Sequence, residues 1–180
     1  MSIKSLVQGT LAACLLALPL TALGVPTNTP TNITITEIVD PFLEWDSTNT
    51  NTIDATNLGH ITDATTAKSF TRSLNIFTNT NATLAPTAGD GNAGVLTGAV
   101  HGQTLLTTYK LAGAGVDALT RDAAFVSAAA FINAGNNAYS ITHVSGTGTY
   151  VVDLSVKADP NGTAADADTY SCIITLTATW

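Results

Sequence analysis

The sequence contains little charge, since only 11% of its 180 residues are Asp, Glu, Lys or Arg. Basic residues are the scarcer kind, with 6 Lys and Arg against 13 Asp and Glu, and the formal net charge is −7. Nucleic acids and anionic membranes are bound through clustered Lys and Arg. We therefore expect no nucleic-acid partner. The remaining composition, rich in Thr, Ala, Asn and Gly, is typical of extracellular β proteins with a neutral surface.

Cysteine is also scarce, with one residue, Cys172, beyond the N-terminal region. A single thiol cannot form an internal disulfide, so the fold must hold without one. Two interpretations of Cys172 stay open: a small buried strand residue, or a residue with a redox or intermolecular role. Cys14 follows small residues, as in bacterial lipoproteins. However, Leu15–Leu20 after it is apolar and unlike a linker, so the sequence favours an ordinary signal over lipidation.

Only one long apolar run occurs, and it lies at the N-terminus. Lys4, the apolar Leu11–Leu20 and the small-residue site Ala22–Gly24 together predict a secretory signal peptide over residues 1–24. No later stretch reaches the ~18 apolar residues that a membrane helix requires. We expect residues 25–180 to be exported and soluble, and their length favours a single domain.

No local motif for catalysis, metal or cofactor binding stands out. Gly89–Gly94 matches G-x-G-x-x-G, but a dinucleotide site needs a helix after it, and Val95 begins an apparent strand. His60, His101 and His143 are isolated, without metal-ligand spacing. The G-x-S-x-G motif is missing. We expect no enzyme, metal or cofactor, although an active site assembled from distant residues stays open.

What the sequence does contain is apolar residues alternating with Thr, Ser and Asn, the pattern of half-buried strands. Turn residues separate these segments. The pattern predicts an all-β sandwich. Arg121–Ile132 is ambiguous between helix and strand, and its surroundings favour strand. Ala85–Gly94 is predicted to be a turn-rich connection. The clearer strands are predicted over Phe42–Trp45, Ser69–Thr78, Val95–Val100, Thr104–Leu111, Ala138–Val144, Thr149–Lys157 and Tyr170–Trp180.

A further strand is predicted directly behind the signal peptide, at Asn32–Pro41. Ile33, Ile35 and Val39 fall on one face, and the alternating positions on the other are mostly polar. Pro41 has no amide hydrogen and ends the strand. A strand at a free N-terminus is connected to the domain at one end only, so it can readily pair with a neighbouring molecule.

Asn32–Pro41 also resembles the mature N-terminus of the major pilins of alpha-clade chaperone–usher fimbriae, the colonisation-factor-antigen family. Gly102–Lys110 is similar to a mid-chain segment of that family, and Tyr170–Leu176 to the opening of its terminal strand. Two positions depart from the pattern. Glu37 stands on the apolar face, where the family tends to have a small residue, and Cys172 stands where Gly is usual.

The resemblance implies an incomplete immunoglobulin-like β-sandwich that is completed by a donated N-terminal strand. On this basis residues 1–24 would be the signal peptide, 25–40 the donor extension and 41–180 the sandwich domain. The implied partners are identical pilin subunits joined head to tail, a periplasmic chaperone, an outer-membrane usher and a tip adhesin. The implied location is the cell surface, in a fimbrium.

The resemblance also implies the site residues. Ile33, Ile35 and Val39 would be donated to the next subunit. The acceptor groove, which is also the chaperone-contacting strand, would comprise Tyr170, Ile174, Leu176 and Ala178. The implied function is that of a structural fimbrial subunit that supports adhesion. The alternative is a secreted or lipid-anchored, monomeric β-sandwich that binds carbohydrate, although aromatic residues are only 6% of the chain and do not cluster.

Overall fold

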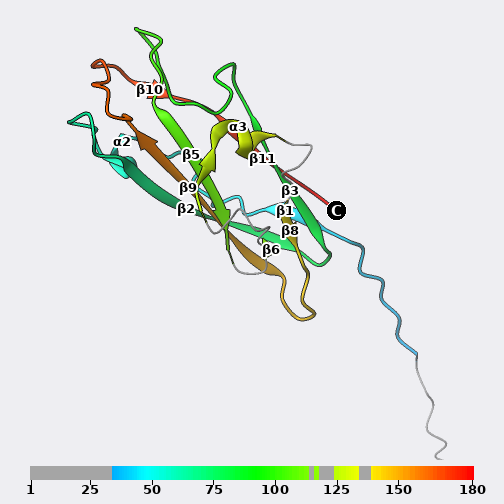
Figure 1. Cartoon of the computed structure of the whole chain (residues 1–180). Coiled ribbons are helices and arrows are strands. Elements are labelled where there is room, and N and C mark those ends of the chain that lie inside the picture. Colours follow the sequence, from blue (N-terminus) through cyan, green and yellow to red (C-terminus); the bar gives the residue numbers. More distant parts are fainter. Residues whose placement is uncertain (1–33, 114–115, 118–123, 134–138) are drawn as a thin grey trace, which may run out of the picture. The chain divides into compact units, whose positions relative to one another are not determined.

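The computed structural model describes residues 34–113, 116–117, 124–133 and 139–180 (Figure 1). By their contacts the residues divide into two compact units, Met1–Ile38 and Val39–Trp180. Residues 34–38 of the first unit form neither helix nor strand, and residues 39–41 form none either, so the strand predicted over Asn32–Pro41 is not formed in its described part. The predicted signal peptide and Ile33 lie outside the described residues, so the predicted domain boundaries stay predictions.

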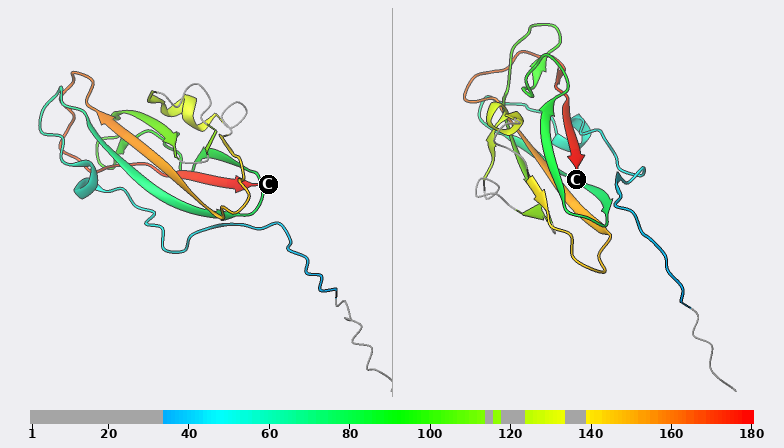
Figure 2. Two further views of the ribbon diagram at one scale, coloured as in Figure 1. Left: turned by 90° about the horizontal axis from the view of Figure 1, so that it is seen from below. Right: turned by 90° about the vertical axis from the view of Figure 1, so that its right-hand side faces the viewer.

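The second unit is an all-β sandwich of antiparallel strands, and this confirms that part of the predicted fold class (Figures 1 and 2). One sheet has the order β1 (Leu43–Trp45), β2 (Lys68–Thr78), β9 (Thr149–Asp159), β5 (Leu106–Ala112), β7 (Val126–Ser127). The other has the order β11 (Ile174–Thr179), β3 (Ala82–Ala88), β8 (Tyr139–Ile141), β6 (Val116–Asp117). A two-stranded sheet pairs β10 (Tyr170–Ser171) with β4 (Thr97–Gly98).

The core is filled by the inward side chains of both sheets. On the long central pair β2–β9, Ile76 lies opposite Tyr150, and both are buried. Leu84 and Tyr139 contribute from the facing sheet. The alternation that predicted β2 and β9 from the sequence is therefore the alternation between core and surface.

Arg121–Ile132 is not a continuous strand, so that prediction was wrong for its described part. Only Val126–Ser127 is strand, and a short helix follows, α3 (Ala128–Ile132). The Ser127 hydroxyl accepts a hydrogen bond from the amide of Ala130, which caps the first turn. Three alanines then favour the helix, and Phe131 on it is fully buried.

Two boundaries in the middle of the chain also differ from the prediction. Ala85–Gly94 is not all turn, because β3 continues to Ala88. Pro86 is accommodated because β8 pairs with β3 only as far as Leu84, so no bond from its nitrogen is needed there. In Val95–Val100 only Thr97–Gly98 is strand. In the part of the chain that the structure describes, no helix is long and apolar enough to cross a membrane.

Candidate functional site

Strand β11 forms one edge of its sheet. It pairs with β3 along its whole length, from Ile174 opposite Ala88 to Thr179 opposite Thr83. No strand among the described residues pairs with its second edge. Because backbone donors and acceptors alternate along both edges of a strand, an unpaired edge is a template for another strand.

The inward side chains of β11 are only half-buried, unlike those of the central strands. Ile174, Leu176 and Ala178 pack against the core yet keep part of their surface exposed, whereas Val152 on β9 is fully buried. The alternating Thr residues of β11 are exposed. Ile174, Leu176 and Ala178, which the resemblance implied to share a face, therefore do pack inward, and they are only partly covered there.

The chain from β1 to α2, near β11, also carries apolar side chains that are only half-buried. Strand β1 contacts β11, and it pairs with β2 only over Ile76–Thr78 before the chain leaves the sheet. The side chains from this segment that pack against the core are also half-buried. We call the half-buried apolar side chains of the two segments the apolar edge: Leu43, Trp45, Ile53, Leu58, Cys172, Ile174, Leu176 and Ala178.

A basic side chain interrupts the core-facing side of β2 beside the apolar edge. Arg72 alternates with Leu74 and Ile76 on β2, and its backbone lies opposite Leu154 of β9. Its Nη2 donates to the carbonyl of Thr52, at 2.9 Å, and to Asn57 Oδ1, at 2.9 Å. The Nε is buried without a hydrogen-bond partner among the described residues.

The partner of Arg72 is held in place by a short helix that the sequence analysis missed. Helix α2 (Ala55–Leu58) begins at Asp54, whose carboxylate accepts from the amides of Thr56 and Asn57. The Asn57 side chain in turn accepts from the Asp54 amide, which completes a capping box. The sequence signal was Asp54 followed three residues later by Asn57.

Cys172 lies at the start of the apolar edge, against a tyrosine of the other sheet. Its Sγ is 3.1 Å from the hydroxyl of Tyr109, which donates to the carbonyl of Gly94 at 2.7 Å. Burial raises the pKa of both the Tyr109 hydroxyl and the Cys172 thiol. Cys172 is therefore a half-buried packing residue with a weakly ionised thiol.

Tyr170, predicted to open the terminal strand, lies in β10 instead of β11. It pairs with Gly98, and its hydroxyl donates to the carbonyl of Asp166 at 3.0 Å. The structure therefore brings together Ile174, Leu176 and Ala178, and it places Tyr170 in the separate two-stranded sheet.

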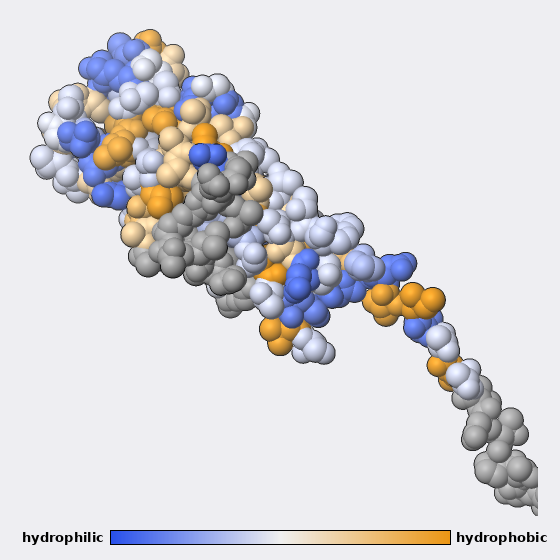
Figure 3. All heavy atoms as spheres, turned by 45° about the vertical axis from the view of Figure 1, so that its right-hand side comes forward, coloured by the Kyte–Doolittle hydropathy of each residue, from blue (hydrophilic) through white to orange (hydrophobic). Residues whose placement is uncertain are grey.

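The predicted donor residues lie at the junction of the two units. Ile35 is 89% exposed and Val39 is 75% exposed, while Ile33 lies outside the described residues. Figure 3 shows apolar residues, in orange, between hydrophilic ones along the described segment that precedes β1. The apolar side chains of Ile35 and Val39 are therefore exposed to solvent.

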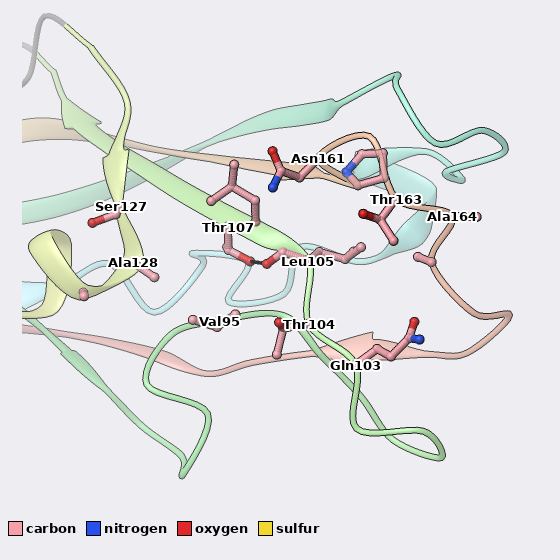
Figure 4. A pocket seen from close by; sticks show the side chains of 14 residues that line it. Val95, Gln103, Thr104, Leu105, Thr107, Ser127, Ala128, Asn161, Thr163 and Ala164 are labelled. Atoms are coloured by element: carbon pink, nitrogen blue, oxygen red, sulfur yellow. Dashed lines mark hydrogen bonds between the residues drawn. The ribbon is translucent and has the colours of Figure 1, made fainter.

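A second feature is an open depression of about 520 Å³ beside β5 and α3 (Figure 4). Its lining carries no charged side chain and mixes apolar residues, such as Val95 and Leu105, with polar ones, such as Thr104, Ser127 and Asn161. The Thr107 hydroxyl is already used, since it donates to the carbonyl of Leu105 and accepts from the amide of Leu96. Within the described ranges, no group of three or more His, Cys, Asp or Glu residues could hold a metal ion.

No family model matches the chain, and no curated protein matches it. A solved structure from work on a chaperone–tip adhesin complex in the activation of CFA/I fimbriae biogenesis is similar in shape, with a TM-score of 0.44 and 14% sequence identity. The likeness covers 78% of this chain and 42% of that one, so this chain spans less than half of its length.

Proposed function

We propose that this protein is a structural subunit of a chaperone–usher fimbria, exported through the periplasm and assembled on the cell surface. Each copy donates its N-terminal strand to the next copy, and the fibre supports adhesion. A periplasmic chaperone holds each subunit before the exchange at the outer-membrane usher, and a tip adhesin ends the fibre. The protein performs no catalysis in this role.

The observation that carries this proposal is the unpaired second edge of β11. An added strand there would gain backbone hydrogen bonds along β11 and would cover the half-buried Ile174, Leu176 and Ala178. Strand addition of this kind is a known mode of peptide recognition and is used in pilus assembly. The exposed segment around Ile35 and Val39 has the alternation that such a strand requires.

The energies are sufficient for a fibre without covalent links. Full burial of an Ile or Val side chain contributes about 1.5–3 kcal/mol, and Ile33, Ile35 and Val39 would all be buried. Each ladder hydrogen bond adds about 0.5–1.5 kcal/mol net. Because a copy gives its strand to one neighbour and accepts a strand from another, the contact does not close, and an open filament results.

The test compares neighbouring residues on opposite faces of the donor and acceptor segments. Ile35→Lys and Leu176→Lys place a charge on the faces that would be buried between copies, so fibre assembly should be lost. Thr36→Lys and Thr177→Lys place the same charge one residue away, on the opposite faces, and should assemble like the wild type. Fibre length by electron microscopy and size-exclusion chromatography are the measurements.

A different result points to the alternative. If the purified wild-type chain stays monomeric and all four variants behave alike, β11 accepts no strand. The protein would then be a stand-alone sandwich, and a screen for carbohydrate binding would be the next step.

A further inference from the structure

We propose that Glu37 of one copy forms an ion pair with Arg72 of the next copy, and that this pair fixes the register of the donated strand. The inference rests on the proposed function. It adds the charged residue on each copy, Glu37 or Arg72, that sets how the donated strand aligns with the acceptor. It follows from two charged residues that interrupt apolar faces, one on each side of the same contact.

The first of these residues is Glu37 in the donor segment. Ile33, Ile35, Glu37 and Val39 alternate in sequence and share one face of an extended strand. That face is the one that would enter the sandwich of the acceptor. A carboxylate buried there without a cation would be strongly unfavourable, so the acceptor must supply a partner.

The second residue is Arg72 on the core-facing side of β2. Its Nη2 has two oxygen partners, Thr52 and Asn57, and both are neutral. Its Nε is buried and has no partner in the described part of the chain. A half-buried guanidinium with neutral partners and one unused donor is suited to a carboxylate, which it can bind through parallel hydrogen bonds.

The direction of the strands brings the two charges to the same end of the sandwich. In Figures 1 and 2, β11 starts toward the end where α2 lies and runs toward the other end. Arg72 donates to Asn57 of α2, so Arg72 lies on the side of the start of β11. Ile174 is the first residue of β11.

A donor strand that runs antiparallel to β11 therefore places Glu37, which follows Ile35, nearer the start of β11 than Ile35. With Ile35 opposite Leu176, Glu37 lies opposite Ile174, at the end where Arg72 lies. In a parallel strand with Ile33 at Ile174, Glu37 would instead lie near Ala178, at the far end. If the donor strand slips by two residues along β11, its apolar face still points inward, but Glu37 then lies opposite Leu176 and away from Arg72. Burial of apolar side chains alone permits both registers, and the ion pair selects one of them.

The test is a charge-reversal cycle in the full-length chain. Glu37→Arg and Arg72→Glu each place two like charges together, and each should weaken the association between copies by at least about tenfold. The double variant restores opposite charges and should recover most of this loss. The measurement is the guanidinium concentration at which the fibres dissociate. Lys68→Glu, a reversal four residues from Arg72 on the same strand, is the matched control and should not be rescued by Glu37→Arg.

Each outcome separates this inference from the proposed function. Fibres that form in all variants, with losses that simply add in the double variant, would overturn the ion pair and leave strand donation standing. Wild-type chains that never form fibres would overturn both. If Arg72→Glu fails to fold, fibres of Glu37→Arg are compared with fibres of Thr36→Arg, which places the same charge on the outer face of the donor strand. Equal losses of fibre stability in guanidinium for the two variants would overturn the ion pair.

Discussion

The hydroxyl of Tyr109 lies 3.1 Å from the Sγ of Cys172, and this contact joins β5 to the short link between β10 and β11. Tyr109 belongs to β5, while Cys172 lies between β10 and the edge strand β11, two residues before Ile174. The ring of Tyr109 also stacks on Phe131 of α3, with a centroid distance of 4.9 Å. The tyrosine thus links the chain just before β11 to the buried core.

Replacing Tyr109 with Phe should destabilise the domain by about 1–3 kcal/mol, because the carbonyl of Gly94 loses its buried donor. The free energy of unfolding by guanidinium measures this. Tyr170→Phe, which removes a solvent-exposed hydroxyl bond, is the control and should cost less. Equal losses for the two variants would contradict the role given to Tyr109.

Cys172 should react slowly with a thiol reagent at pH 8 in the folded protein. The thiolate is the reactive form, and burial raises the pKa of this thiol, so less thiolate is present than in the unfolded chain. The expected result is a reaction rate at least about tenfold lower than in denaturant. A rate unchanged by denaturant would indicate an exposed thiol.

The carboxylate of Asp168 holds the loop between β4 and β5 through hydrogen bonds from backbone amides. Its Oδ2 accepts from the amides of Val100, at 2.8 Å, and His101, at 3.0 Å, and lies 3.6 Å from His101 Nδ1. Its Oδ1 accepts from the amide of Thr169. The hydrogen bond from the His101 amide, helped by that from Val100, lowers the pKa of this carboxyl below 3.8.

A lowered folded-state pKa means that the ionised carboxylate stabilises the native state. The contribution is present above the unfolded value of 3.8 and is lost as the pH falls through the folded value. Asp168→Asn should therefore lower the melting temperature at pH 7, and the difference from the wild type should shrink below pH 4. A difference that stays constant between pH 7 and pH 2 would show that the charge is not the cause.

Gly113, directly after β5, allows the chain to pass close to β9. Its φ is +143°, and an added Cβ would clash with the carbonyl oxygen of Val151. Gly113→Ala should therefore cost about 3 kcal/mol or more, because the backbone must move. Gly148→Ala, where a Cβ would meet nothing within 4 Å, is the control. Unfolding free energies of the two variants provide the comparison.

Much of the fold follows from local alternation, which is strong where a strand has one dry and one wet face. This holds for β2 and β9, and for β11, which lies within the predicted strand Tyr170–Trp180. It failed at β3, because Ala85–Ala88 were predicted to belong to a turn-rich connection. It also failed at α3, where three alanines favour a helix and Ser127 caps its first turn, although strand was predicted from the surroundings.

The candidate site was predictable only on its β11 side. The sequence showed that Ile174, Leu176 and Ala178 share a face, because that is a property of one strand. It could not show that Arg72 lies beside Asn57 with an unused Nε, because that depends on the packing of distant segments. The contact of Tyr109 with Cys172 is of the same kind.

The central claim, that the sandwich lacks one strand, is tested most directly by thermal melting of two rearranged chains. One lacks residues 25–40; the other carries that segment at its C-terminus, after a short flexible linker that lets it reach β11. If the sandwich is incomplete, the relocated strand should raise the melting temperature by tens of degrees, because it covers Ile174, Leu176 and Ala178 within the same molecule. Equal melting temperatures for the two chains would contradict strand donation.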